Sequence, residues 1–213
     1  MWTTRYKPPG QPVFRPHDDP GGPCVLADLL ADQPWRAEIA WPVGFEGGIC
    51  HRLDTSTSGA VLVADTLDAL DAARERFRAG TLTKTYRLRA ARAPTWAENR
   101  CVAMIGHDPR KRDRMVVQRG PSTPHRGRWL PADTRFRRLA GPLLEATITT
   151  GVMHQIRVHA AFLGVTLAGD RTYGGGPTPD DAPPGATFLL HHVGLVGAGL
   201  ATDPVPLPPW ART

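Results

Sequence analysis

The sequence is poor in several features, and each shortage excludes a class of protein. Three cysteines, an odd number with no CxxC pair, argue against a disulfide framework and a cysteine-based zinc site. No apolar run approaches the roughly 18 residues of a membrane span, and the N-terminal MWTTRYKPPG lacks the apolar core of a secretion signal. The phosphate-binding patterns GxGxxG and GxxxxGK[ST] and the GxSxG turn of serine hydrolases are also missing. We therefore expect a cytoplasmic protein with no membrane span and no nucleotide cofactor.

Lysine is scarce as well, with only Lys7, Lys84 and Lys111 among 26 basic residues. Coding bias in a GC-rich genome explains the many arginines, but it does not explain where they lie. Residues 110–138 hold ten basic and two acidic residues, a net charge of +8 in a chain whose total is +6. A basic segment on a nearly neutral body is typical of an element that grips phosphates. The alternative is a solvated surface loop.

The apolar pattern predicts one mixed domain over residues 1–213, without internal repeats or a linker. Strands are expected where apolar residues run on or alternate, at 60–64, 84–90, 143–150 and 188–195. Helices are expected at 24–30, 66–79 and 153–163, with Gly80 and Gly164 as stops. Glycines and prolines in the basic segment 110–138 favour a hairpin or long loop with short strands. Because turns connect the strands as often as helices do, the pattern predicts an α+β fold with a mixed, mainly antiparallel sheet and flanking helices.

One loop, HRLDTSTSG at 51–59, places a single carboxylate, Asp54, before a buried strand. Arg52 lies two residues earlier, and a nearby guanidinium favours the ionised form of a carboxylate. An ionised and positioned carboxylate can act as a nucleophile, a general base or a metal ligand. The alternative is that Asp54 caps the turn through Thr57 or Ser58.

A second cluster, GVMHQIRVH at 151–159, contains two histidines that do not form a metal-binding pair. His154 and His159 are five residues apart and do not share the i, i+4 face of a zinc helix. His159 lies on the apolar face and is interpreted as a core histidine, as are His191 and His192. Arg157 lies about 100° around the helix from Ile156, so its side chain can leave the core edge and reach a loop.

Taken together, these motifs resemble the RluA-type RNA pseudouridine synthases. HRLDTSTSGAVLVA is similar to the family signature HRLDxxTSG, and four further stretches agree in the same order: KPPGQPV, FRAGTLTKTYRLRA, TTGVMHQIRVHAAFLGVTLAGDRTYGG and FLLHHVGL. The resemblance spans nearly the whole chain. It implies a pseudouridine synthase fold with a central RNA-binding cleft, and an enzyme that isomerises uridine in RNA with no cofactor and no metal.

The resemblance also implies site residues. Asp54 matches the catalytic aspartate, which attacks the flipped nucleotide covalently. The resemblance leaves open whether the attack falls on the base or on the sugar C1′. Tyr86 matches the tyrosine that stacks on uracil and is a candidate for removing the C5 proton, and Arg157 matches the arginine that pairs with the aspartate. Arg52 matches the residue that fills the space left by the flipped base. We assign further RNA contacts to His154 and Gln155 and to the basic residues Arg110, Lys111, Arg112 and Arg114.

Two departures from the family pattern keep a competing function open. Val152 stands where the family has arginine, and no S4-type RNA-binding domain fits ahead of Tyr6. We expect a monomer that binds ribosomal or transfer RNA through this one domain, with the basic segment as its targeting element. The alternative is an RNA-binding protein or RNA chaperone with a decayed active site. A sugar-cleaving hydrolase is a poorer option, because the motifs offer no second carboxylate.

Overall fold

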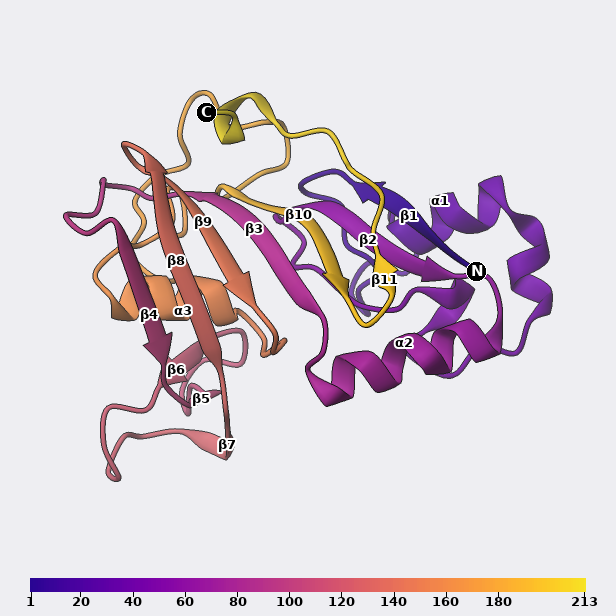
Figure 1. Ribbon diagram of the computed structural model, residues 1–213, viewed down its shortest axis with the longest axis horizontal. Coiled ribbons are helices and arrows are strands. Elements are labelled where there is room, and N and C mark those ends of the chain that lie inside the picture. Colours follow the sequence, from indigo (N-terminus) through magenta and orange to yellow (C-terminus); the bar gives the residue numbers. More distant parts are fainter.

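The computed structural model describes residues 1–213, and an eight-stranded sheet forms its centre (Figure 1). Across the sheet the order is β1 (Trp2–Lys7), β2 (Ser58–Ala64), β10 (Leu190–Gly197), β3 (Thr83–Arg89), β9 (Leu143–Ile148), β8 (Asp133–Ala140) and β4 (Glu98–Val102). The short β11 (Leu200–Ala201) pairs with β10. Only β2 and β10 run parallel, and all other pairs are antiparallel. The predicted mixed, mainly antiparallel sheet is confirmed.

A second, three-stranded sheet has the order β6 (Met115–Val117), β5 (Ile105–His107), β7 (Arg126–Leu130). The basic segment 110–138 supplies β6 and β7, so the predicted short strands are present. The prediction was wrong for its last part, because residues 133–140 form β8, a full strand of the main sheet. Buried Thr134 and Phe136 alternate there with exposed Arg135 and Arg137, which is the pattern of a strand with one face in the core.

Three α-helices flank the sheet: α1 (Val25–Asp32), α2 (Leu67–Ala79) and α3 (Gln155–Phe162). Single 3₁₀ turns lie at Pro34–Glu38, Glu46–Gly48 and Pro209–Ala211. Helix α2 begins and ends where the sequence predicts. The Thr66 hydroxyl accepts a hydrogen bond from the Ala69 N–H at its start, and Gly80 is left-handed with φ 66° at its end. The prediction for α3 began two residues too early, because His154 has a φ of 55°, which a right-handed helix cannot contain.

Strand β2 is buried along its whole length, as its continuous apolar run predicts. Val61 and Val63 belong to the main core, which also includes residues of α1 and α3. Leu62 faces the other way and packs with Leu70 of α2. Glycine is required at position 59, where φ is 126° and a Cβ would lie 2.1 Å from the His192 carbonyl oxygen on β10. A rigid strand therefore begins directly after the loop that carries Asp54.

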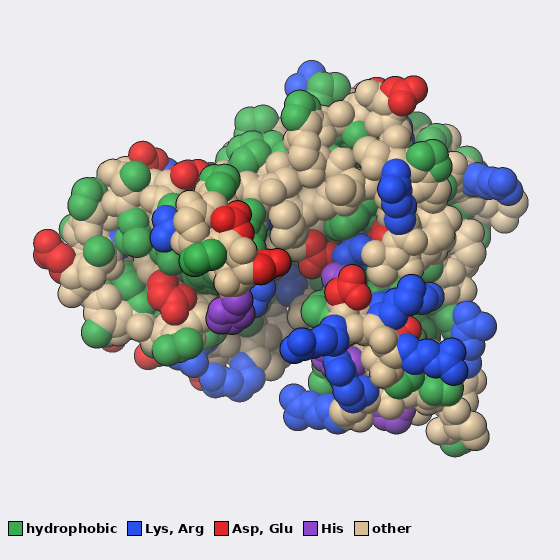
Figure 2. Space-filling view, turned by 180° about the vertical axis from the view of Figure 1, so that it is seen from behind, with side chains coloured by type: hydrophobic (Ala, Val, Ile, Leu, Met, Phe, Trp, Pro, Cys, Tyr) green, Lys and Arg blue, Asp and Glu red, His purple; other side chains and the backbone are tan.

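The helices and the small sheet give the molecule two unequal halves, with a cleft between them. In Figure 1, α1 and α2 lie beside β1 and β2, whereas α3 and the three-stranded sheet lie beside β8 and β4. The cleft has a volume of about 1100 Å³, and it is lined by loop 51–57, β3, α2 and the start of α3. In Figure 2 the Lys and Arg side chains gather on the lower block, which contains the small sheet. None of the helices combines the length and the apolar character that crossing a membrane would require.

Candidate active site

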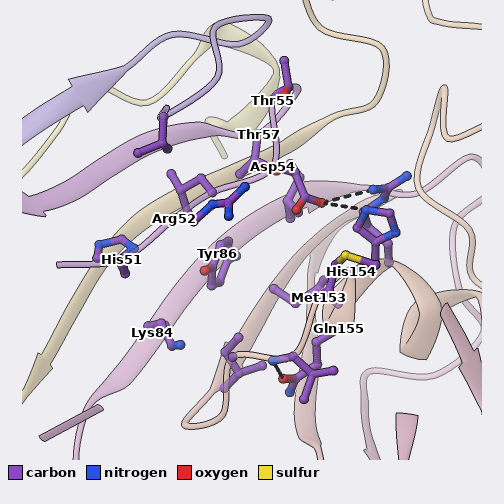
Figure 3. A pocket seen from close by; sticks show the side chains of 18 of the residues that line it. His51, Arg52, Asp54, Thr55, Thr57, Lys84, Tyr86, Met153, His154 and Gln155 are labelled. Carbon is purple, nitrogen blue, oxygen red and sulfur yellow. Dashed lines mark hydrogen bonds and ion pairs between the residues drawn. The ribbon is translucent and has the colours of Figure 1, made fainter. Parts of the chain in front are cut away.

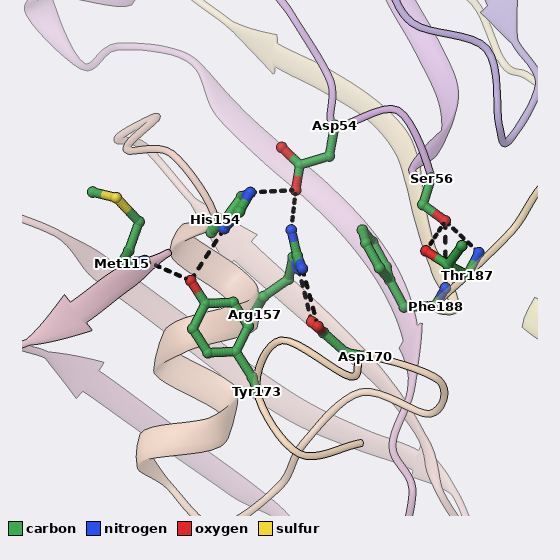
Figure 4. A network of polar contacts seen from close by, with 9 residues as sticks. All are labelled: Asp54, Ser56, Met115, His154, Arg157, Asp170, Tyr173, Thr187 and Phe188. Atoms are coloured by element: carbon green, nitrogen blue, oxygen red, sulfur yellow. Dashed lines mark hydrogen bonds and ion pairs between the residues drawn. The ribbon is translucent and has the colours of Figure 1, made fainter. Parts of the chain in front are cut away.

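Asp54 lies in the cleft and makes its contact with the opposite half of the molecule. The backbone carbonyl of Asp54 accepts a hydrogen bond from the Thr57 N–H at 2.9 Å, which closes the turn. The carboxylate is free of this turn, and its Oδ2 accepts a hydrogen bond from Arg157 Nη1 at 3.1 Å (Figure 4). Oδ1 makes no hydrogen bond. The alternative in which the Asp54 carboxylate caps the turn is therefore wrong.

Arg157, the third residue of α3, is held in place from several sides. Its Nε and Nη2 donate to Asp170 Oδ2 and Oδ1 at 2.7 and 3.0 Å, a two-point contact with a carboxylate that is 1% exposed. The guanidinium also lies over the Phe188 ring, 4.2 Å from its centroid. Burial by itself lowers the pKa of Arg157, but the hydrogen bonds and charges of Asp170 and Asp54 raise it overall. The cation that faces Asp54 is thus fixed in position and charge.

Asp170 is a residue that the sequence reasoning did not identify as functional, although it stands in the GDRTYG stretch of the family motif. It follows a turn in which its N–H donates to the Leu167 carbonyl at 3.1 Å. The signal for it was a carboxylate inside an apolar and glycine-rich motif, where a buried charge needs a partner. The sequence does not show which arginine that partner is.

His154 lies beside the same carboxylate and is connected to the small sheet. Its Nδ1 is 3.1 Å from the Tyr173 hydroxyl, which accepts a hydrogen bond from the Met115 N–H of β6 at 2.9 Å. Burial lowers the pKa of His154, so its ring is neutral near pH 7. We assign the Tyr173 proton to Nδ1 and the ring proton to Nε2, which is 3.9 Å from Asp54 Oδ2. Figure 4 shows this chain from Met115 to Asp54.

Tyr86 points from β3 into the cleft next to the Asp54 loop (Figure 3). Its side chain is on the buried face of the strand, as the alternation predicts, and the ring packs against His192 with centroids 4.6 Å apart. Burial, with the charge of Asp54, raises the pKa of Tyr86 well above its usual range. The phenol is therefore protonated at neutral pH. The residue is 7% exposed but lines the cleft, and its phenol would have to ionise before acting as a strong base.

Arg52 and Gln155, which were both predicted to contact RNA, lie in different environments. Arg52 lines the cleft and is exposed, but it has no ion pair, so the cation beside Asp54 is Arg157 instead. Gln155 is 3% exposed, and both ends of its amide bond to the protein, accepting from Thr150 and Val152 and donating to the Asp133 carbonyl and Thr134. This geometry leaves no polar atom of the Gln155 side chain unbonded, and its contact with RNA stays a prediction.

The core histidines are confirmed. His159 is fully buried between the Thr134 hydroxyl at 2.9 Å and the Ala103 carbonyl at 3.1 Å. His191 contacts Ser58 at 2.9 Å, and His192 donates to the Ala60 carbonyl at 2.6 Å. Burial lowers the pKa of each of these last two rings to about 4. No group of three or more His, Cys, Asp or Glu side chains is placed to hold a metal ion.

The basic residues assigned to RNA lie in the loop between β5 and β6. Arg110, Lys111 and Arg112 are exposed and have no side-chain ion pair. Asp108 shapes the loop by accepting hydrogen bonds from the Arg110 and Lys111 N–H groups at 2.8 and 3.2 Å. Arg114 is partly buried, with its guanidinium 5.9 Å from the centroid of the Tyr173 ring. This loop therefore presents three unpaired cations to solvent and one toward the active-site network.

Val152, the departure from the family pattern, has an apolar environment. Its side chain packs against the cluster of Ile105, Met115, Val117, Ala132, Val158 and Tyr173 beneath the small sheet. The substitution thus adds an apolar contact between the small sheet and the loop before α3, where the family's arginine would place a charge.

Comparisons with known proteins agree with this architecture. Residues 6–162 match the family described as RNA pseudouridylate synthase. A protein of Chloroflexus aurantiacus named as an uncharacterized RNA pseudouridine synthase is 37% identical over 172 residues, which cover 79% of this chain and 50% of the relative. Ribosomal large subunit pseudouridine synthase D of Xanthomonas campestris is 36% identical over 187 residues, covering 86% of this chain and 51% of the relative. The chain spans about half the length of these two relatives.

Solved structures show the same fold. The structure of human RNA pseudouridylate synthase domain containing 4 superposes with a TM-score of 0.70 at 23% identity, covering 99% of this chain and 87% of that one. Human RNA pseudouridylate synthase domain containing 1 gives a TM-score of 0.62 at 26% identity, covering 77% and 71%. The α+β architecture and its central cleft thus define a pseudouridine synthase fold. The chain belongs to the RNA pseudouridylate synthase family, which confirms the resemblance inferred from its motifs.

Proposed function

We propose that the protein isomerises uridine to pseudouridine in RNA, with Asp54 as the nucleophile. The observation that carries this proposal is the asymmetric environment of the Asp54 carboxylate. Oδ2 is held by Arg157 at 3.1 Å, while Oδ1 is unbonded in a cleft that also holds the ring of Tyr86. A positioned carboxylate with one free oxygen is the form in which an aspartate attacks carbon.

The reaction that we assign to this site needs no net exchange of atoms. The N1–C1′ bond breaks and a C5–C1′ bond forms, while the proton lost from C5 is balanced by one gained at N1. Attack of Asp54 on C1′ breaks the N1–C1′ bond, and C5 of the released base then bonds to C1′ and expels the carboxylate. Attack on the base instead forms a bond between Asp54 and the base that breaks after C1′ has moved from N1 to C5. Both routes return Asp54 as a free carboxyl group. Arg157 holds Oδ2 of Asp54 in position for the attack. No cofactor is required by this balance.

The substrate has to enter the cleft as a flipped nucleotide. Extruding a base from stacked RNA costs a few kcal/mol, which a wedge, a stacking ring and phosphate contacts together offset. We assign these tasks to Arg52, Tyr86 and the exposed cations Arg110, Lys111 and Arg112, with His154 as a neighbour of the reacting carboxylate. Relatives named as ribosomal large subunit pseudouridine synthase D point to ribosomal RNA as the first substrate to test, and transfer RNA as the second.

Tritium release from RNA labelled at C5 of uridine tests the chemistry. Wild type should release tritium from ribosomal or transfer RNA transcripts, and Asp54→Asn should not. Asp68→Asn, an exposed aspartate on α2, is the matched control and should behave as wild type. If the wild type releases no tritium while still binding RNA, the competing function, an RNA-binding protein with a decayed site, is supported instead.

The role of the basic loop is tested by RNA binding at several salt concentrations. Replacing Arg110, Lys111 and Arg112 by Ala should weaken binding and reduce the slope of log K against log salt by about 0.7–0.9 for each phosphate that the loop no longer neutralises. The control removes an equal charge from exposed arginines outside the loop, with Arg15, Arg92 and Arg212 changed to Ala. Equal slopes for the two triple variants would show that the loop has no special part in RNA binding.

The remaining expectations stay predictions. We expect the protein to act as a monomer in the cytoplasm. These are tested by the mass of the purified protein in solution and by its location in fractionated cells.

A further inference from the structure

Lys84 is a buried cation without a partner. Its side chain is 7% exposed and makes no hydrogen bond or ion pair, and its nearest aromatic contact is the Phe77 ring, whose centroid is 5.5 Å from Nζ. Burial lowers the pKa of Lys84 to about 8. Lys7, the other buried lysine, has a different environment, since its Nζ donates to the Pro8 and Thr55 carbonyls at 2.9 and 2.8 Å. Most of the Lys84 residue is buried, but its ammonium nitrogen is not among the fully buried polar atoms and it lines the cleft. Lys84 therefore presents to the cleft a cation that has no acceptor in the protein, whereas Lys7 has two.

The space around the Lys84 ammonium is shaped to remain open. A Cβ at position 151 would lie 2.9 Å from Lys84 Nζ, so glycine at this position leaves room for the charge. Figure 3 shows Lys84 and Tyr86 pointing from β3 into the same pocket, with Asp54 beyond Tyr86. Because the two side chains are two residues apart on one strand face, they are separated by about 6.6 Å along the cleft floor.

This end of the cleft is positive. The cleft lining includes Arg52, Arg74 and Arg78, and the only acidic side chains in it are Asp54 and Asp113. The neighbouring His192 is neutral, because burial lowers its pKa to about 4 and the charge of Lys84 lowers it as well. No carboxylate near Lys84 neutralises it. The Lys84 ammonium is therefore free to bind an anion that enters the cleft.

We propose that Lys84 Nζ binds a phosphate oxygen of the RNA strand beside the flipped uridine, on the side of Tyr86 away from Asp54. This inference rests on the proposed function, because it requires RNA in the cleft. A compact ammonium suits a phosphate oxygen as a point charge. Phosphate is also the RNA group that supplies the negative charge this end of the cleft lacks.

The test compares Lys84→Met with wild type, both in the Asp54→Asn background so that binding is measured without turnover. With transcripts of large-subunit ribosomal RNA, Lys84→Met should bind more weakly and show a slope of log K against log salt that is smaller by about 0.7–0.9. Arg92→Met, an exposed cation away from the cleft, should leave both quantities unchanged.

Thermal unfolding of the same variants separates binding from a structural role. Methionine has nearly the length of lysine, and an apolar side chain in place of an unpaired buried charge is neutral or stabilising. We expect Lys84→Met to unfold at the same temperature as its parent or higher. A clear loss of stability would overturn the proposal, because it would mean that the charge is satisfied within the protein.

The remaining outcomes are also decisive. Weaker binding with an unchanged salt slope would overturn the phosphate contact and assign Lys84 to a neutral acceptor on the base. Unchanged binding would remove Lys84 from the RNA site. The proposed function is judged separately, since tritium release by an otherwise wild-type chain measures chemistry. A wild type that binds RNA without releasing tritium can still show the Lys84 salt effect.

Discussion

The pair between Arg157 and Asp170 predicts a large and specific effect of one substitution, Asp170→Asn. The change preserves the shape of the side chain but removes its charge, and the new amide turns an N–H donor toward the donors of Arg157. Breaking a buried ion pair by removing one partner costs about 3–5 kcal/mol. In the Asp170→Asn variant Arg157 still has one carboxylate partner, Asp54, whose Oδ2 is 3.1 Å away. We therefore expect a loss of unfolding free energy at the lower end of this range, about 3 kcal/mol. At about 2–4 °C per kcal/mol for a chain of this size, the melting temperature should fall by about 6–12 °C.

The same substitution should also slow the reaction. Arg157 would lose one of the two hydrogen bonds that Asp170 accepts, because an asparagine amide keeps a single oxygen acceptor. A misplacement of about 1 Å in a reacting group can cost about 100-fold in rate. Tritium release at a temperature well below unfolding measures this loss in folded protein. The melting temperature and the rate are therefore predicted to fall together.

Asp181→Asn is the matched control for Asp170→Asn. Asp181 also contacts an arginine at two points, Arg89, at 2.6 and 2.6 Å, but its side chain is 62% exposed. Exposed pairs contribute less than about 1 kcal/mol, so this variant should melt within a few degrees of wild type and retain its activity. If the two variants lost the same small amount of stability, the reasoning from burial would be refuted.

Two further predictions concern Tyr173 and the buried histidines. Tyr173→Phe leaves the Met115 N–H without an acceptor, so hydrogen exchange at that amide should speed up and tritium release should fall, while exposed Tyr6→Phe changes neither. The folded-state pKa values of His191 and His192, about 4, lie below the ordinary 6.5, so the unfolded chain takes up protons first as pH falls. The free energy of unfolding in urea should therefore decrease from pH 6.5 to pH 4, and a flat profile would contradict this.

Local structure was predictable where neighbouring residues determine it. The run Ala60–Ala64 and the alternation at Lys84, Tyr86 and Leu88 match β2 and β3, and Thr66 and Gly80 mark the ends of α2. Strand order was not predictable, because β2 and β10 pair across more than 120 residues, and apolar patterns do not specify partners. The strand 133–140 was missed because the arginines on its exposed face made the whole segment resemble a loop.

The site was predictable in its residue types but not in its contacts. Asp54, Tyr86 and Arg157 line the same cleft, as the motifs imply. The pairing of Asp54 with Arg157 joins positions 103 residues apart, whereas local reasoning favoured Arg52. Asp170 contacts Arg157, and the Tyr173 hydroxyl contacts His154 and the Met115 N–H, only in the folded protein. The spacing of these residues in the sequence does not predict these contacts.

The position of β10 has a consequence for how the protein is made. β10 is the last long strand in the chain, yet it is the only strand that joins β2 to β3. Before residues 190–197 can pair, the earlier strands form three separate ladders: one of β1 and β2, one of β3, β9, β8 and β4, and the small sheet of β6, β5 and β7. Asp54 belongs to the first ladder, and Tyr86 belongs to the second. The nascent chain therefore carries the two sides of the cleft on separate ladders, and these are joined only when β10 pairs with both β2 and β3.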